Sequence, residues 1–264
     1  MNIPPFNRSR VAVVEMYGTI GGAVRSRQFA PMLKSLREDK QVKALVLDID
    51  SPGGSAGDSD YLYDAVRRVR ERKPVIAFIR GTGASGAYYI ACGTQRIIAQ
   101  RSSIVGSIGV ITIRPQMQDL LDKIGVQVSV TATGPLKGAG LPFREETEAE
   151  RVNMRLMVDA FFERLIDVVA DGRRVSRERA RQWATGEVFW ANRALDEGLV
   201  DELGDLERAV AVASSMVNIP EKNAVTVRPR VPLAQRLLKG VGSAAASSLH
   251  AEFERLFVPR IEYR

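Results

Sequence analysis

The chain has 264 residues, enough to bury the core of one large α/β domain or of a domain with a tail. Its composition, 26% charged and 45% hydrophobic, is that of a globular protein. The net charge of +7 comes from arginines spread along the chain, so we expect no nucleic-acid partner. A single cysteine, Cys92, excludes an intramolecular disulfide and a cysteine-rich metal site, and we expect no metal and no cofactor.

The N-terminal residues lack the pattern of a targeting segment. MNIPPFNRSR carries basic residues but is not followed by the apolar core of a signal peptide. No run of about 18 apolar residues, the length of a transmembrane helix, occurs in the sequence. We therefore expect a cytoplasmic protein, or one peripheral to a membrane, unless an N-terminal anchor precedes this sequence.

Strand-like runs alternate with amphipathic helical patterns through the first half of the chain. The predicted strands are 11–18, 42–49, 75–79, 96–100, 108–113 and 126–133. Helices are predicted between several of them, at Ser26–Asp39, Asp58–Arg72 and Gln116–Lys123. Apolar strands that alternate with amphipathic helices indicate an α/β fold with a largely parallel sheet.

The longest helical pattern covers residues 145–171. Its large apolar side chains recur at steps of three and four, which predicts that they belong to the core: Met154, Met157, Phe161, Leu165 and Val168. Shorter helices are predicted after it, and Ser176 and Asp205 are suitable N-caps for two of them. These helices are Ser176–Ala184, Ala191–Glu197 and Asp205–Met216.

Three segments follow from these patterns: an N-terminal lead (1–10), one α/β domain (11–218) and a basic C-terminal extension (219–264). The extension contains an apolar stripe at helical spacing, interrupted by two glycines. A helix that packs on the core or on a neighbouring subunit is the favoured interpretation. The alternative is a helix at a membrane surface, because basic amphipathic helices suit anionic lipid.

The stretch GTGASGAYYIACG (81–93) places Ser85 in a glycine-flanked turn between a predicted strand and a predicted helix. Such a turn can present a serine hydroxyl at the edge of a sheet, beside the amides of a helix N-terminus. GASGA lacks the last glycine of the GxSxG motif, which disfavours an α/β-hydrolase. A nucleophilic Ser85 would still need a base to accept its proton.

Elimination leaves a lysine as the candidate base. The one histidine, His250, lies in the C-terminal extension with no triad signal around it, and arginine stays protonated in proteins. Of eight lysines, Lys137 differs because TGPLKGAGLPF surrounds it with glycines and apolar residues, which favours a neutral amine. An ordinary loop lysine in solvent is the alternative on this segment alone. The other seven are expected on the solvated surface: Lys34, Lys40, Lys43, Lys73, Lys123, Lys222 and Lys239.

A second glycine-rich turn stands in LDIDSPGGSAGD (47–58), between a predicted strand and a predicted helix. Consecutive glycines at such a junction free backbone N–H groups to point at an anion, and the helix N-terminus adds to the field. The turn therefore has the groups of an oxyanion hole. Taken alone, it is also compatible with a plain tight turn.

Together these motifs resemble the S49 signal peptide peptidases, which are serine peptidases with a Ser–Lys dyad on a ClpP/crotonase-like fold. The resemblance rests on SPGG after a strand, GASGAYYIA about thirty residues later, and a glycine-flanked lysine 52 residues beyond the serine. IVGSIGVI (104–111), GLPFREETEAER (140–151) and TGEVFWANRALDEGLVDELGDLERAV (185–210) agree with it. It covers roughly residues 10–215.

The resemblance implies a role for each matching residue. Ser85 would be the nucleophile and Lys137 the general base, and Ser107 would hold the lysine amine in place. Gly54 and the amide of Gly86 would form the oxyanion hole. It also implies a ring-shaped homo-oligomer in which the lysine reaches the serine of an adjacent subunit. The expected substrates are remnant signal peptides and other short or unfolded chains.

Many members of that family carry an N-terminal membrane anchor, whereas here the first predicted strand begins about ten residues from Met1. Three alternatives therefore stay open. The chain could be a soluble or phage-type S49 protease that processes a protein partner, a crotonase-type acyl-CoA enzyme, or a catalytically inactive oligomeric scaffold. The basic extension could also give peripheral membrane contact.

Overall fold

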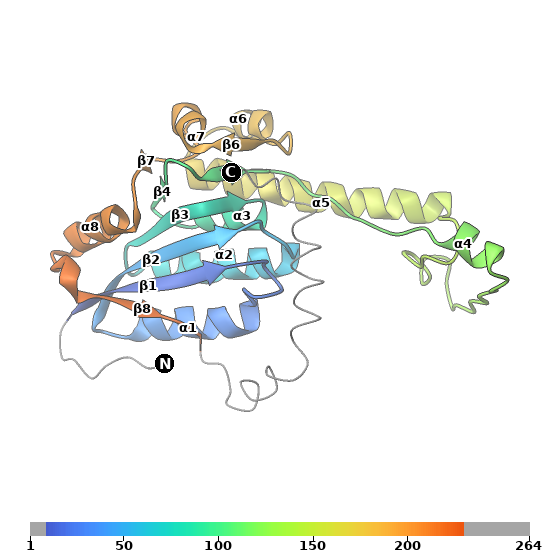
Figure 1. Cartoon of the computed structure of the whole chain (residues 1–264), viewed down its shortest axis with the longest axis horizontal. Helices are drawn as coiled ribbons and strands as arrows, with labels where there is room; N and C mark the ends of the chain where they lie inside the picture. The colour runs from blue at the N-terminus through green and yellow to red at the C-terminus, as the bar shows by residue number, and fades with distance from the viewer. Residues whose placement is uncertain (1–8, 230–264) are drawn as a thin grey trace.

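The computed structural model describes residues 9–229 of the chain (Figure 1). In this part of the chain eight strands form one sheet in the order β6-β5-β3-β2-β1-β8, with β4 paired to β3 and β7 paired to β4. All pairs are parallel except β5 with β6. The strands are β1 (Arg10–Tyr17), β2 (Val42–Ser51), β3 (Val75–Ala84), β4 (Arg96–Ala99), β5 (Ile104–Gly106), β6 (Val188–Trp190), β7 (Glu202–Leu203) and β8 (Ala224–Val227).

Helices cover both faces of the central strands, which is why those strands are almost continuously apolar. Alternate residues of each strand point to opposite faces, so Ala12 and Val14 belong to one buried cluster and Val11 and Val13 to the other. The helices are α1 (Ser26–Glu38), α2 (Ala56–Arg70), α3 (Gly86–Ala91), α4 (Gln118–Lys123), α5 (Glu148–Arg173), α6 (Arg177–Trp183), α7 (Ala191–Glu197) and α8 (Leu206–Val217), with a short 3-10 helix at Glu221–Asn223.

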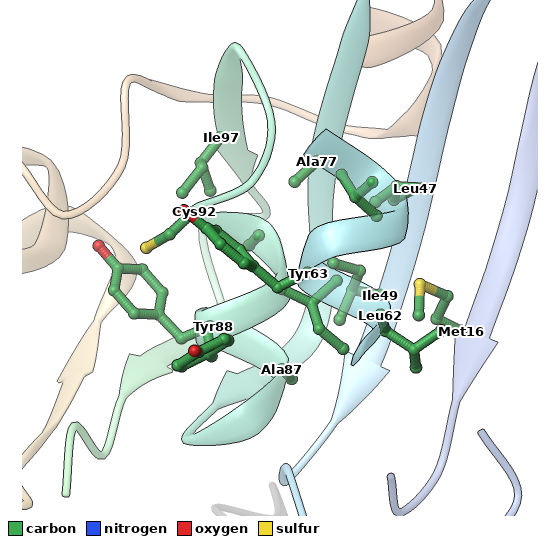
Figure 2. Packing of buried hydrophobic residues seen from close by; sticks show 14 of the residues in the cluster. Met16, Leu47, Ile49, Leu62, Tyr63, Ala77, Ala87, Tyr88, Cys92 and Ile97 are labelled. Carbon is green, nitrogen blue, oxygen red and sulfur yellow. The ribbon is translucent and has the colours of Figure 1, made fainter. Parts of the chain in front are cut away.

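The larger cluster lies between the sheet and helices α1, α2, α3 and the C-terminal half of α5, whereas α8 covers the other face. Figure 2 shows Tyr63 of α2 and Tyr88 of α3 gathered with Leu47 and Ile49 of β2. Cys92, at the end of α3, is buried in the same cluster. The packing therefore fixes the ends of β2 and β3, where the candidate site residues lie.

Helix α5 is only half a core helix. Leu165 and Val168 are buried as predicted, but the prediction was wrong for Met157 and Phe161, whose side chains are 47% and 46% exposed. The reason is that the N-terminal half of α5 continues beyond the sheet (Figure 1). The helix begins with a capping box between Thr147 and Glu150.

Residues 108–147 form an arm that leaves the sheet after β5 and ends where α5 begins (Figure 1). Helix α5 then leads the chain back to the sheet (Figure 1). The arm runs beside the N-terminal half of α5, because 112–116 and 154–158 line one groove. Two strands predicted here, 108–113 and 126–133, are not formed. A strand needs a partner edge, and within the described chain the arm has none. Its exposed valines and isoleucines produced a strand pattern without strand pairing.

The folded domain extends past the expected boundary at residue 218, because β8 pairs in parallel with β1. Its sequence, AVTV, has the β-branched residues that suit an edge strand. The predicted helix of the C-terminal extension and His250 lie outside the described residues, as does most of the N-terminal lead. Between residues 9 and 229, no helix combines the length and the apolar character needed to cross a bilayer.

Candidate active site

Ser85 occupies a sharp turn between β3 and α3. Its backbone has φ 52° and ψ −121°, a conformation that residues other than glycine rarely adopt. The Ser85 N–H donates a hydrogen bond of 2.7 Å to the Gly106 carbonyl. This strained turn leaves the side chain half-buried and directed to the end of the sheet where the carboxyl ends of the strands meet. The predicted glycine-flanked turn is therefore confirmed in the structure.

The glycine pair after β2 lies against this turn. Gly53 and Gly54 have φ of 96° and 142°, and a Cβ on Gly54 would lie 2.2 Å from the Ile20 carbonyl oxygen. Ile20 also holds the loop through two hydrogen bonds, from its own N–H to the Gly53 carbonyl (2.8 Å) and from the Ser55 N–H to its carbonyl (2.9 Å). Ser55 then caps α2 by accepting the Asp58 N–H.

The backbone N–H groups of Gly54 and Gly86 have no hydrogen-bond partner within residues 9–229. Both glycines line the same cavity as Ser85. Gly54 lies just before the N-terminus of α2, and Gly86 is the first residue of α3, so both N–H groups lie in the positive field of a helix N-terminus. The arrangement can stabilise a negative oxygen beside the Ser85 hydroxyl.

This cavity has a volume of about 380 Å³. Its apolar walls come from Val110 and Ile111 of the arm and from Phe161 and Leu165 of α5. One wall is polar, because α2 contributes Asp60. A cavity of this kind beside the Ser85 side chain suits a small, mostly apolar ligand group.

Ser107 lies beside Ser85. The pairing of β3 with β5 places Ala84, the last residue of β3, opposite Gly106, the last residue of β5. Ser85 and Ser107 directly follow these two residues. Ser107 also has a positive φ, 48°, and its N–H donates to the Glu187 carbonyl at 2.7 Å. Ser85, Ser107, Gly54 and Gly86 are thus brought together at one end of the sheet.

Lys137 is not brought to this cluster. It is exposed on the arm, in a turn whose next residue, Gly138, accepts a hydrogen bond of 3.1 Å from Arg144. Arg144 in turn binds the buried carboxylate of Glu150 in the first turn of α5. From Glu150 to Phe161, at the cavity, α5 rises about 16 Å, which is well beyond the reach of a lysine side chain. The apolar surroundings predicted for Lys137 are not formed within one chain, because Leu136 and Phe143 are exposed.

Glu150 holds the turn that carries Lys137. The hydrogen bond from the Arg144 guanidinium, aided by the Thr147 N–H, lowers the pKa of Glu150 to about 2. The carboxylate therefore stays ionised at neutral pH and keeps the arm attached to α5.

The other lysines follow the prediction with one correction. Lys73 is half-buried, and its amine donates to the Leu36 and Asp39 carbonyls at 2.5 and 2.6 Å, so it caps the end of α1. Burial lowers the pKa of Lys73. Lys239 lies outside the described residues, and five are exposed as predicted: Lys34, Lys40, Lys43, Lys123 and Lys222.

Sequence reasoning did not find the polar wall of the cavity. Asp60 accepts hydrogen bonds from Tyr89 of α3 and Arg164 of α5, three residues that come from three separate helices. Burial, with the Asp60 carboxylate, raises the pKa of Tyr89, so its phenol keeps the proton that it donates. No motif marks these residues in the sequence, since Asp60 and Arg164 look like ordinary charges on helix surfaces.

Comparison with known proteins identifies the family. Residues 67–220 match the family described as Peptidase family S49. The chain belongs to peptidase family S49. This S49 chain is 34% identical over 237 residues to the slr0021 protein of Synechocystis sp.. The match covers 88% of this chain and 84% of the slr0021 protein. It is 32% identical over 254 residues to the chloroplastic serine protease SPPA of Arabidopsis thaliana, with 90% of this chain but 37% of the plant protein covered.

The S49 chain is a serine peptidase, as the sequence motifs predicted. Its fold is similar to that of the 1510-N membrane-bound stomatin-specific protease. The matching structure is that of a lysine-to-alanine mutant of this protease in complex with a substrate peptide. That match has a TM-score of 0.51 and 19% identity, and covers 88% of this chain and 97% of the other. The fold is also similar to a ClpP1 mutant of Listeria monocytogenes, with a TM-score of 0.52 and 15% identity over 75% of this chain and 93% of ClpP1. The ClpP/crotonase-like fold is therefore confirmed.

Proposed function

We propose that this S49 peptidase hydrolyses short or unfolded peptides, such as remnant signal peptides, with a Ser–Lys dyad that is completed between subunits. Ser85 of one subunit is the nucleophile, and Lys137 of an adjacent subunit is the general base. The observation that carries the proposal is the contrast between the surroundings of Ser85 and those of Lys137. Ser85, the free N–H groups and the cavity are assembled within one chain, whereas Lys137 lies on an exposed arm.

In this mechanism the neutral amine of Lys137 removes the proton from the Ser85 hydroxyl as its oxygen attacks the scissile carbonyl. The N–H groups of Gly54 and Gly86 stabilise the oxyanion, a contribution typically worth about 3 kcal/mol for each donor. The lysine ammonium then protonates the leaving amine. Water repeats the sequence to release the acyl-enzyme, and the Ser107 hydroxyl orients the amine.

The surface of the arm supports assembly of several copies. The arm and the adjoining half of α5 expose many large apolar side chains outside the cavity, which we call the apolar arm surface: Ile113, Met117, Leu120, Ile124, Val126, Val128, Val130, Leu136, Phe143, Val152, Leu156 and Met157. An exposed apolar area of this extent is typical of a protein interface. A second copy of this chain is the occupant that would also cover Lys137 and supply the apolar surroundings that favour a neutral amine.

The substrate class is supported by the cavity beside Ser85, which has a volume of about 380 Å³ and room for one substrate side chain. Ser85 is half-buried and lines this cavity, so an extended peptide reaches it more easily than the surface of a folded protein does. The 1510-N protease, a protein of similar fold, holds a substrate peptide when a lysine is replaced by alanine.

The experiment that tests the proposal is peptide hydrolysis by single variants. Ser85→Ala and Lys137→Ala each lose nearly all turnover and stay folded, because neither side chain supports the core. The matched control is Lys123→Ala, which removes another exposed lysine of the arm and retains the wild-type rate. Turnover by Lys137→Ala close to that of wild type would refute the base, and turnover by Ser85→Ala would refute the nucleophile.

A further inference from the structure

The polar wall of the cavity contains a carboxylate, Asp60, of which only one oxygen accepts hydrogen bonds. Asp60 accepts hydrogen bonds on Oδ1 from the Tyr89 hydroxyl and from Arg164 Nε at 3.1 Å. Its other oxygen, Oδ2, accepts no hydrogen bond from residues 9–229. Asp60 lines the cavity that also contains Ser85, so a carboxylate oxygen is available to a group that enters the cavity.

The partners of Asp60 fix its position with respect to the nucleophile. Tyr89 lies one helical turn after Ser85, and its N–H donates to the Ser85 carbonyl at 2.9 Å. Tyr89 therefore links Asp60 to the helix that begins directly after Ser85, and both residues line the same cavity. The Arg164 guanidinium stacks over the Tyr63 ring, with its carbon 5.7 Å from the ring centroid.

Arg164 pairs with one oxygen of Asp60, because its Nε and its Nη2 both lie 3.1 Å from Oδ1. Arg164 also lies 3.8 Å from Asp64, which has a second partner in Arg68 at 3.7 Å. Arg164 lines the cavity together with Asp60, and the apolar part of the lining includes Phe161, Leu165 and Ile111. An apolar channel that ends at a carboxylate oxygen fits an aliphatic stem with a cationic end.

We infer that Asp60 determines specificity, so that the cavity accepts lysine or arginine on the residue that precedes the scissile bond. This inference rests on the proposed function, because it assigns the cavity beside Ser85 to that residue. The methylene stem of the substrate side chain lies against Phe161 and Leu165. The ammonium or guanidinium donates to Asp60 Oδ2, while Tyr89 and Arg164 keep the carboxylate oriented through Oδ1.

The test uses two fluorogenic peptides that differ only in having lysine or norleucine before the scissile bond. Norleucine keeps the aliphatic stem and lacks the amine, so the ratio of the two kcat/KM values isolates the contact with Oδ2. Wild type cleaves the lysine peptide at least as efficiently as the norleucine peptide. In Asp60→Asn the lysine-to-norleucine ratio falls about tenfold or more, as expected for the loss of one hydrogen bond to a charged group.

Three controls separate this contact from a structural effect. Asp60→Glu, which keeps the charge, has a ratio between those of wild type and Asp60→Asn. Asp64→Asn removes a carboxylate from the same guanidinium, but Asp64 does not line the cavity, so its ratio stays close to that of wild type. Thermal unfolding verifies that each variant is folded.

A second readout does not depend on turnover. The same peptides are titrated against Ser85→Ala with and without Asp60→Asn, and the ratio of their Kd values is expected to change as the kcat/KM ratio does. If norleucine peptides are hydrolysed but neither ratio responds to Asp60→Asn, the inference is wrong and the proposed function stands. If no hydrolysis depends on Ser85, the proposed function is wrong, and the Kd ratio alone then decides whether Asp60 binds a cation.

Discussion

Gly53 packs directly beneath Ser85: a Cβ built on this glycine would lie 2.8 Å from the Ser85 Cβ and 2.7 Å from the Gly86 nitrogen. The glycine turn after β2 and the turn at Ser85 therefore support each other. We predict that Gly53→Ala lowers the free energy of unfolding by about 3 kcal/mol, through steric overlap and its positive φ. The same change abolishes peptide hydrolysis, because both turns must move.

Gly57 provides the matched control for stability. It lies two residues into α2, and a Cβ there would meet no atom within 4 Å. Gly57→Ala is expected to raise the free energy of unfolding by about 0.5 kcal/mol, because alanine loses less backbone entropy in a helix. Equal effects of the two substitutions in chemical denaturation would contradict the close packing at Gly53.

The strain at Ser85 gives a second prediction. A residue with a side chain at φ 52° and ψ −121° is held there against its preference, whereas glycine adopts this conformation readily. Ser85→Gly is therefore expected to be inactive and about 1 kcal/mol more stable than wild type. The measurement is denaturant unfolding beside Ser85→Ala, which removes the hydroxyl but keeps the strain. A Ser85→Gly protein no more stable than Ser85→Ala would show that the turn is not strained.

Local sequence patterns were sufficient to predict much of this site. The glycines around Ser85 and at 53–54 indicate turns for a local reason, since their conformations exclude most side chains. Buried strands such as 42–49 and helix caps such as Asp205 were predicted because their signals are also local. The turn at Ser85 and the glycine turn at 53–54 could therefore be located without a structure.

The arm could not be predicted in this way. Ile111 and Val128 alternate with polar residues as strand residues do, yet Ile111 is 79% exposed and pairs with nothing in the described chain. Whether such a segment pairs depends on a strand edge, and residues 9–229 supply none to it. The cavity wall was missed for a related reason, because Asp60 and Arg164 are 104 residues apart and only the tertiary fold brings them together.

A third prediction concerns acid and the attachment of Lys137. Hydrogen bonding by Arg144 lowers the pKa of Glu150 from 4.5 to about 2, so the ion pair stabilises the fold above about pH 4.5 and is lost as the pH falls towards 2. In Glu150→Gln this contribution is absent at every pH. The Tm difference between wild type and Glu150→Gln should be full at about pH 6 and should shrink below about pH 4. A difference that is unchanged down to about pH 2 would contradict the pairing.

The apolar arm surface gives a fourth prediction. Leu156, which belongs to this surface, is 63% exposed, and Leu156→Arg would place a charge in the proposed contact between copies. We expect a smaller assembly by light scattering and a loss of hydrolysis, because Lys137 no longer meets a neighbouring Ser85. The control is Met216→Arg on α8, an exposed apolar residue outside this surface. Leu156→Arg with the mass and activity of wild type would show that this surface is not the interface.

Mixing two inactive variants tests the shared dyad most directly. Ser85→Ala and Lys137→Ala are unfolded together, refolded as a mixture, and assayed with one peptide substrate. If each site takes its serine from one subunit and its lysine from the next, about a quarter of the sites in the mixture contain both, and activity returns to that level. A mixture that assembles like wild type but stays as inactive as its components would contradict a dyad formed between subunits.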